Sequence, residues 1–419
     1  MYYLNKFLNI IDNVIKMGKD PLYSNSFFIM GTRFITSFSG FIFWFIATKY
    51  FSSNEIGEAV GLISTMGLIM NFSIIGLNYG LIRYIPIIKN KSIFINSLMN
   101  FTILLSILIS SIFILFNILL KTRISEEYNI FIIINFLFYI INNIILFYYT
   151  NSFISIRKSK YSFLINAIFA SRIIFIPFLF PLGYIGLIMA FEISFILVTI
   201  IGYFLLKRFG INIKVICNIN YIKKIFKFSI HNYISNFSTQ LLPFLLPILV
   251  IIVLDTQETA YFFIAYKAAI IVNILPHAIF SSLFVEGSHK EKSIKLLIKK
   301  SLFMYIIFFI PFLIIYAMMG KIILNIFDTE YGNNSLFIYH LILLSVFLSS
   351  IIQLYFTIMR IMKRTQIIMI ISIIMFVLTC FSSIILMSIN NNISGIGYGL
   401  IITNIIVIAL IIIISLCKK

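Results

Sequence analysis

Four ionisable side chains lie inside long apolar runs of this sequence: Arg33, Arg172, Glu192 and Lys267. An ionised side chain near the centre of a bilayer costs at least about 2.5–3.5 kcal/mol on insertion scales, so it usually faces a water-filled cavity or a partner. Arg33 and Lys267 therefore each have two interpretations. Either they face such a cavity, or Arg33 extends to the nearby membrane surface and Lys267 pairs with a carboxylate such as that of Glu258.

Arg172 and Glu192 lie on adjacent apolar runs, which we expect to be antiparallel helices that place the two groups at similar depth. An intramembrane ion pair is the simpler interpretation. The alternative is that Glu192 binds a proton or a sodium ion as a coupling site. Apart from such an ion, the sequence indicates no cofactor.

Polar side chains also interrupt the runs at 226–254 and 258–286, and these are His231, Asn236, Gln240 and His277. They are candidates for contact with the hydroxyl groups of a bound ligand, although hydrogen bonding between helices is more common for such residues. No pair of histidines has metal-ligand spacing on one helix face, and the three cysteines are scattered. Neither zinc chemistry nor a disulfide framework is predicted.

The composition places all of these groups in a membrane protein. Of 419 residues, 61% are hydrophobic and 11% are charged, and the mean hydropathy is +1.08. A soluble domain has about a quarter charged residues, and a disordered chain has low hydrophobicity. P-loop, GxSxG and HExxH motifs are absent. The expected outer connections are short, so a membrane-embedded glycosyltransferase or polymerase is a weaker alternative and we predict no enzyme.

The sequence predicts an all-α integral membrane protein with twelve transmembrane helices. Residues 1–25 precede them as an amphipathic segment that Gly18 and Pro21 end. The apolar runs fall at 26–50, 56–85, 92–120, 128–150, 161–181, 184–206, 226–254, 258–286, 294–320, 334–359, 365–389 and 394–416.

The distribution of Lys and Arg among the connections predicts the orientation of the chain in the membrane. With both termini in the cytoplasm of a multi-pass cell-membrane protein, the outer connections hold only Lys49, Lys121, Arg123 and Lys321. This agrees with the rule that Lys and Arg concentrate in cytoplasmic loops. The net charge of +19 therefore indicates membrane lipids as partners and no nucleic acid.

The two halves of the chain have similar short motifs at corresponding connections between spans, which indicates an internal duplication. Asn54-Glu55-Ile56-Gly57 after the first span corresponds to Gln257-Glu258-Thr259-Ala260 after the seventh. We expect lobes of six helices at 26–206 and 226–419, joined by a basic cytoplasmic linker at 207–225. Transporters with such parallel repeats bind cargo between the halves and alternate access.

Several segments resemble the polysaccharide-repeat-unit flippases of the multidrug/oligosaccharidyl-lipid/polysaccharide exporter superfamily. They cover nearly the whole chain: 50–63 (YFSSNEIGEAVGLI), 75–86, 258–284, 327–345 and 395–400.

The resemblance implies two lobes around a central cavity lined mainly by spans 1, 2, 7 and 8. It also implies a polyprenyl-diphosphate-linked oligosaccharide as cargo, moved from the cytoplasmic to the outer leaflet for cell-surface polysaccharide synthesis. Polysaccharide polymerases and glycosyltransferases would then be partners. Arg33 and Lys267 would meet the diphosphate, because Arg binds phosphate oxygens in bidentate fashion. A multidrug exporter of the same superfamily is the closer alternative.

Overall fold

The computed structural model describes residues 21–119, 130–288, 294–362 and 364–416, and every regular element in them is a helix. In this part of the chain, eleven helices are long and apolar enough to cross a membrane, or twelve if one bent pair counts as a single span. The all-α membrane fold that the sequence predicts is confirmed.

The first half of the chain forms the first six spans in the predicted order. Their bounds are α2 Pro21–Tyr50, α3 Ser53–Ile74, α4 Leu77–Tyr84, α5 Lys91–Leu119, α7 Ile130–Ser155, α8 Ser159–Phe169, α9 Arg172–Leu179 and α10 Tyr184–Arg208.

The second half of the chain holds the remaining spans, with two short helices, α17 and α18, between the ninth and the tenth. The bounds are α11 Ile219–Ser235, α12 Phe237–Val253, α13 Thr256–Ile270, α14 Ile274–Ser288, α15 Ile294–Met304, α16 Ile310–Met318, α17 Gly320–Phe327, α18 Thr329–Asn334, α19 Leu336–Ile361, α20 Thr365–Asn390 and α21 Ser394–Leu416.

The first membrane helix begins earlier than the sequence predicts. Helix α2 starts at Pro21, which the sequence analysis takes as the end of an interfacial segment. Proline suits the first position of a helix because its missing N–H would have no partner there, and its fixed φ is already helical. The remainder of the predicted amphipathic segment, residues 1–20, lies outside the described residues.

Several spans are broken rather than continuous. In span 2 the chain turns at Ile75 and Gly76, both with positive φ, and Gly76 adopts this conformation without the steric cost of a side chain. Spans 7 and 8 are also interrupted, at Asn236 and over Ile271–Asn273. Broken spans release backbone polar groups, which are tolerated where protein or a cavity meets them.

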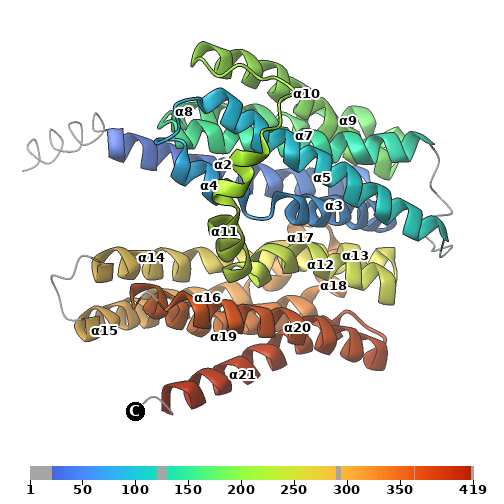
Figure 1. The fold of residues 1–419 in the computed structure, drawn as a ribbon. Coiled ribbons are helices and arrows are strands. Elements are labelled where there is room, and N and C mark those ends of the chain that lie inside the picture. Colours follow the sequence, from blue (N-terminus) through green and yellow to red (C-terminus); the bar gives the residue numbers. More distant parts are fainter. Residues whose placement is uncertain (1–20, 120–129, 289–293, 363, 417–419) are drawn as a thin grey trace, which may run out of the picture. The chain divides into compact units, whose positions relative to one another are not determined.

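The chain divides into two compact units, which are described separately here (Figure 1). Unit 1 holds the chain up to Phe43 together with Ile69–Asn232, and unit 2 holds Trp44–Leu68 together with the chain from Tyr233. The boundaries differ from the predicted lobes because packing assigns Trp44–Leu68, from the first repeat, to unit 2. The repeat itself stays a prediction.

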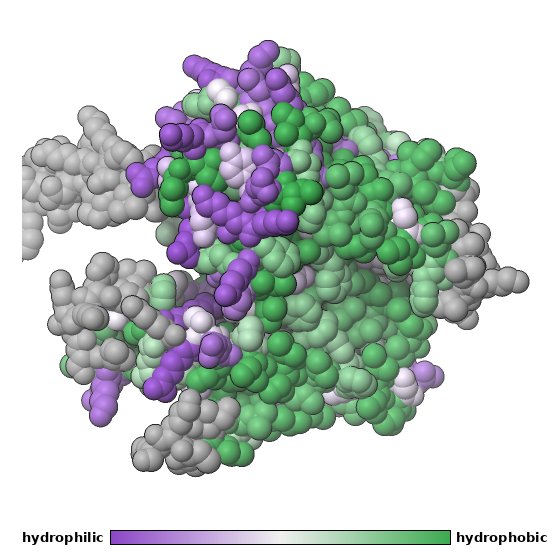
Figure 2. Space-filling view, in the orientation of Figure 1, coloured by the Kyte–Doolittle hydropathy of each residue, from purple (hydrophilic) through white to green (hydrophobic). Residues whose placement is uncertain are grey.

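Each unit has an aromatic interior and an apolar surface. In unit 1, Phe169 stacks on Phe195 at 4.8 Å and Tyr139 meets the same ring edge-on at 5.3 Å. In unit 2, Tyr305 packs on Phe309 at 4.8 Å between ring centroids. Figure 2 shows hydrophobic side chains over most of the visible surface of each unit, with hydrophilic ones gathered toward one end. This is the distribution expected of helices that cross a bilayer.

Candidate functional site

In unit 2, helix α3 approaches the second half of the chain through glycines. A Cβ at Gly57 would lie 1.7 Å from the carbonyl oxygen of Thr256, and one at Gly61 would lie 2.8 Å from Ile251 Cδ1. Small residues spaced by four positions let membrane helices pack at short distance. The glycines therefore set the separation between α3 and the α12–α13 connection.

We call this region the outer junction, since the sequence predicts that it lies at the outer membrane surface. It consists of Trp44–Leu68, the α12–α13 connection with the start of α13, and the α17–α18 connection. Trp44, the only tryptophan of the chain, is 6% exposed and meets the ring of Phe263 edge-on at 4.8 Å.

Glu330 is the polar centre of the outer junction. Its Oε1 accepts hydrogen bonds from Ser53 Oγ at 3.1 Å, from Gln257 Nε2 at 3.1 Å and from the hydroxyl of Tyr261. These donors come from α3 and α13, whereas Glu330 itself is on α18. One carboxylate thus ties three helices together.

The end of α17 provides a second polar contact in the outer junction. The hydroxyl of Thr48 donates to the carbonyl oxygen of Phe327 at 3.0 Å, and Lys49 Nζ donates to the same oxygen. A helix C-terminus carries partial negative charge and unpaired carbonyls, so a lysine there is favourable. The end of α2 is therefore fixed to the end of α17.

Asp328 follows directly and caps α18. The backbone N–H of Glu330 donates to Asp328 Oδ1 at 3.1 Å and holds the pKa of that carboxyl below its ordinary range, with smaller contributions from Thr329 and Lys49. The stabilisation from this cap is present above the ordinary pKa of Asp. It is lost as the pH falls through the lowered value.

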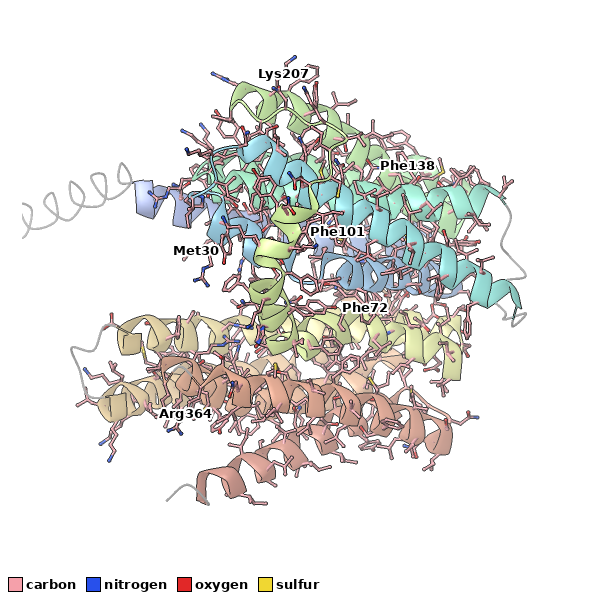
Figure 3. The ribbon with its side chains drawn as sticks, in the orientation of Figure 1. Met30, Phe72, Phe101, Phe138, Lys207 and Arg364 are labelled. Atoms are coloured by element: carbon pink, nitrogen blue, oxygen red, sulfur yellow. The ribbon has the colours of Figure 1, made fainter. Side chains whose placement is uncertain are left out.

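Arg33 lies on an exposed face of α2 in unit 1. The opposite face is packed: Thr32 and Ser39 are buried, and Gly31 approaches the ring of Phe163. Arg33 shares this exposed stretch of α2 with the hydroxyl side chains of Thr36 and Ser37. Large apolar side chains are exposed on the same stretch, and they are Phe27, Met30, Phe34 and Phe38, of which Figure 3 labels Met30.

Lys267 is the exposed position in an otherwise buried stretch of α13. Ile264 and Ala265 before it, and Ala268 and Ala269 after it, are all fully buried. Its Nζ lies 5.1 Å from the centroid of the Phe263 ring, a cation–π contact. Lys267 therefore presents a cation on the one open side of a packed helix.

A polar face on α19 contacts two of the predicted residues in unit 2. Gln353 Nε2 lies 2.9 Å from His277 Nδ1, and Arg360 Nη2 donates to Asn236 Oδ1 at 3.4 Å. Neither Gln353 nor Arg360 is among the candidates predicted from the sequence. Their spacing of seven residues, two helical turns, was the available signal.

The other two predicted polar residues lie elsewhere. Gln240 is half-buried in the first turn of α12. His231 is exposed on α11 in unit 1, with its Nδ1 2.7 Å from the carbonyl oxygen of Lys227. Contact of these side chains with a cargo stays a prediction.

Arg172 and Glu192 are both buried in unit 1, with 4% and 7% of their surfaces exposed. The guanidinium lies 4.2 Å from the ring centroid of Phe169 and 4.9 Å from that of Phe191, and its Nη2 donates to Ser39 Oγ at 3.3 Å. Arg172 Nε and Nη1 and Glu192 Oε1 have no hydrogen-bond partner. The two groups share one buried layer, held by aromatic rings, and their coupling or structural role stays a prediction.

Within the described residues, no group of three or more His, Cys, Asp or Glu side chains could hold a metal ion. The charged and polar side chains described above are therefore the chemically distinctive groups of the structure.

Comparison with known proteins was made at the levels of sequence and structure. No protein-family model matches the chain, and no curated protein matches its sequence. Solved structures do match over nearly the whole length. A multidrug resistance MATE family transporter of the MOP superfamily, in an inward-facing conformation, superposes with a TM-score of 0.64 at 13% identity, covering 92% of this chain and 96% of that one. This chain has the fold of MOP-superfamily transporters.

Two further structures agree with this fold. An outward-facing MATE family transporter gives a TM-score of 0.57 at 12% identity, with 96% of this chain and 98% of that chain covered. A MOP superfamily transporter from Pyrococcus furiosus, described as having a binding pocket of reverse polarity that suggests a different function, gives 0.53 at 10% identity over the same shares. All three neighbours are transporters, and the MOP-type fold confirms the predicted twelve-helix architecture.

Proposed function

We propose that this protein is an alternating-access transporter that moves a lipid-linked anionic glycan, a polyprenyl-diphosphate oligosaccharide, from the cytoplasmic to the outer leaflet. The MOP-type fold supports the transporter class. The cargo class rests on one observation: Arg33 and Lys267 are exposed cations within two apolar candidate spans, Phe27–Tyr50 and Thr256–Phe284. A diphosphate is the anionic group that such cations suit, since charge-assisted hydrogen bonds to phosphate oxygens are strong.

The surroundings of Arg33 favour a cargo with an apolar anchor. Four large apolar side chains, those of Phe27, Met30, Phe34 and Phe38, are exposed on the same stretch of α2 as Arg33. A soluble anion would gain nothing from this apolar face, whereas a polyprenyl chain would bury it. Glycosyltransferases that build the glycan and a polymerase that consumes it are the partners we propose.

In the proposed transport cycle, the contacts of the outer junction close the outer end of the protein in one of its states. Its glycine contacts and its Glu330 network join first-half and second-half helices at one end, and alternating access requires such contacts to break when that end opens. The proposed cycle therefore includes separation of Ser53 and Gln257 from one another.

Multidrug export is the second candidate, because two of the solved neighbours are described as multidrug resistance transporters. Reconstitution in liposomes separates the two. We expect the protein to move a fluorescent lipid-diphosphate oligosaccharide across the bilayer and to leave a cationic dye behind. Dye transport without movement of the lipid-linked glycan would contradict the proposed cargo and favour drug export.

Glu192 is the proposed ion-coupling residue. A buried carboxylate with an unpartnered oxygen is costly when ionised, so proton or sodium binding would relieve that cost. We expect Glu192→Gln to move cargo at a rate that no longer responds to an imposed pH or sodium gradient, with cargo affinity unchanged.

The matched control is Glu286→Gln, because Glu286 is an exposed carboxylate on α14. Gradient dependence is measured in the same liposomes by setting the internal and external ion concentrations. A Glu192→Gln protein that keeps the full response to both gradients would remove Glu192 from the coupling mechanism.

A further inference from the structure

The connection between α10 and α11 is a fixed strap on unit 1. Ser92 Oγ and Asn96 Nδ2 both donate to the carbonyl oxygen of Asn212, each at 2.7 Å. Asn100 Nδ2 donates to the carbonyl oxygens of Lys214 and Ile216 at 2.9 and 3.0 Å. The three donors recur every four residues, so they form one line along α5. We call residues 211–218 the strap.

The hydrogen bonds fix which side chains the strap presents outward. Ile211 is 2% exposed and anchors one end, and the backbone N–H of Asn218 donates to Ser97 Oγ at 2.9 Å at the other. Between them, Lys214 is exposed and Val215 is 98% exposed. A fully exposed valine beside a lysine on an immobilised backbone is unfavourable in water alone.

Helix α11, like the strap, has one packed side and exposes apolar side chains next to lysines. Its buried face carries Ile222 and Ile225, 5% and 0% exposed, and Ile225 lies against Gly80 of α4. Ile219 and Phe226, 59% and 40% exposed, lie beside this buried face. The exposed lysines of this helix, which flank those two side chains, are Lys223, Lys224 and Lys227.

The charged residues of the strap and α11 are all basic. The sequence has no Asp or Glu between Glu192 and Asp255. Basic residues also end α10, where Figure 3 shows Lys207 pointing away from the helices of unit 1. At 17 residues, α11 is also too short to span a bilayer by itself.

We propose that the strap and α11 bind anionic phospholipid headgroups of the cytoplasmic leaflet. An interfacial helix with lysines on its polar side and apolar side chains beside them suits this partner: the lysines meet the phosphates and the apolar groups enter the acyl boundary. Val215, Ile219 and Phe226 argue for a lipid over a soluble anion, because a soluble anion leaves them in water. This binding is independent of the cargo.

The test places a reporter on the strap. Val215→Cys is made in a chain whose Cys217, Cys380 and Cys417 are serine, and it is labelled with an environment-sensitive fluorophore. The protein is reconstituted in nanodiscs of phosphatidylcholine with or without phosphatidylglycerol. We expect a blue shift of emission with phosphatidylglycerol that high salt reverses, since salt screens exposed charges.

Two double variants complete the test. Lys223→Gln/Lys224→Gln should weaken phosphatidylglycerol retention, measured by native mass spectrometry, on the order of 30-fold. Lys299→Gln/Lys300→Gln removes the same charge from α15, outside the strap and α11, and should retain the lipid. Equal spectra in both nanodiscs, equal loss in both variants, or reversal of the shift by inorganic phosphate at an ionic strength at which sodium chloride leaves the shift unchanged would overturn the proposal.

Discussion

We expect Gly57→Ala to reduce transport about tenfold or more, although a single methyl group is all that it adds. The new Cβ would lie 1.7 Å from the carbonyl oxygen and 2.5 Å from the carbonyl carbon of Thr256. Both are backbone atoms and cannot rotate away. The substitution therefore forces α3 and the α12–α13 connection apart and weakens the closed outer junction.

Helix propensity alone would predict the opposite effect of Gly57→Ala, a more stable helix. Alanine in a helix interior is about 1 kcal/mol more favourable than glycine. Overpacking of a close contact costs about 1–3 kcal/mol, and each 1.4 kcal/mol changes a population tenfold. Gly40→Ala is the matched control, because its Cβ would meet nothing closer than Arg172 Nη2 at 3.8 Å. It should transport normally.

Closure of the outer junction is measurable by cross-linking. Thr256 Oγ1 and Asn54 Oδ1 are 3.1 Å apart. Asn54→Cys/Thr256→Cys, in a chain without its native cysteines, should form a disulfide rapidly, and Gly57→Ala should slow the reaction. If the Gly57→Ala protein cross-links and transports as fast as the Gly40→Ala protein, the glycine contact has no role in the cycle.

The second large effect is expected at the two exposed cations. Hydrogen bonds to charged groups contribute about 1.5–3 kcal/mol, so Arg33→Ala and Lys267→Ala should each lower the affinity for a lipid-diphosphate oligosaccharide about 10- to 100-fold. Arg33→Lys should be intermediate, since it retains the charge and loses the bidentate geometry. Binding is measured with the labelled cargo in detergent and transport in liposomes.

Arg208→Ala serves as the control for Arg33→Ala, and Lys299→Ala for Lys267→Ala. Arg208 and Lys299 are exposed basic residues, Arg208 at the end of α10 and Lys299 on α15, and neither belongs to the proposed cargo site. If the cation variants bind and transport as their controls do, Arg33 and Lys267 do not recognise the cargo, while the transporter fold is unaffected.

The positions of the spans could be predicted from the sequence because the bilayer dictates their length and polarity. The tenth and eleventh runs, for example, differ from α19 and α20 by a few residues at most. The interruptions at Gly76 and Asn236 were not predicted, since hydropathy averages over a break of one or two residues. Pro21 was misplaced because proline is common both after a helix and at its first position.

The candidate site was predictable only as residue types. Charge inside an apolar run identified Arg33, Lys267, Arg172 and Glu192, and the structure gives each a defined environment. It could not identify their neighbours: the aromatic rings around Arg172 come from three separate helices. Likewise, Gly57 and Gly61 have a recognisable spacing, but the sequence does not show that Gly57 approaches the backbone of Thr256 and Gly61 the side chain of Ile251.

The pairing of Trp44 with Phe263 gives this protein a built-in optical signal. Since the chain has one indole, ultraviolet emission excited at its red edge comes from that position alone. A shielded indole emits at shorter wavelength than a hydrated one, so departure of Trp44 from the Phe263 ring into water would appear as a red shift. Stopped-flow spectroscopy could therefore time the conformational change in an unlabelled, unmutated chain.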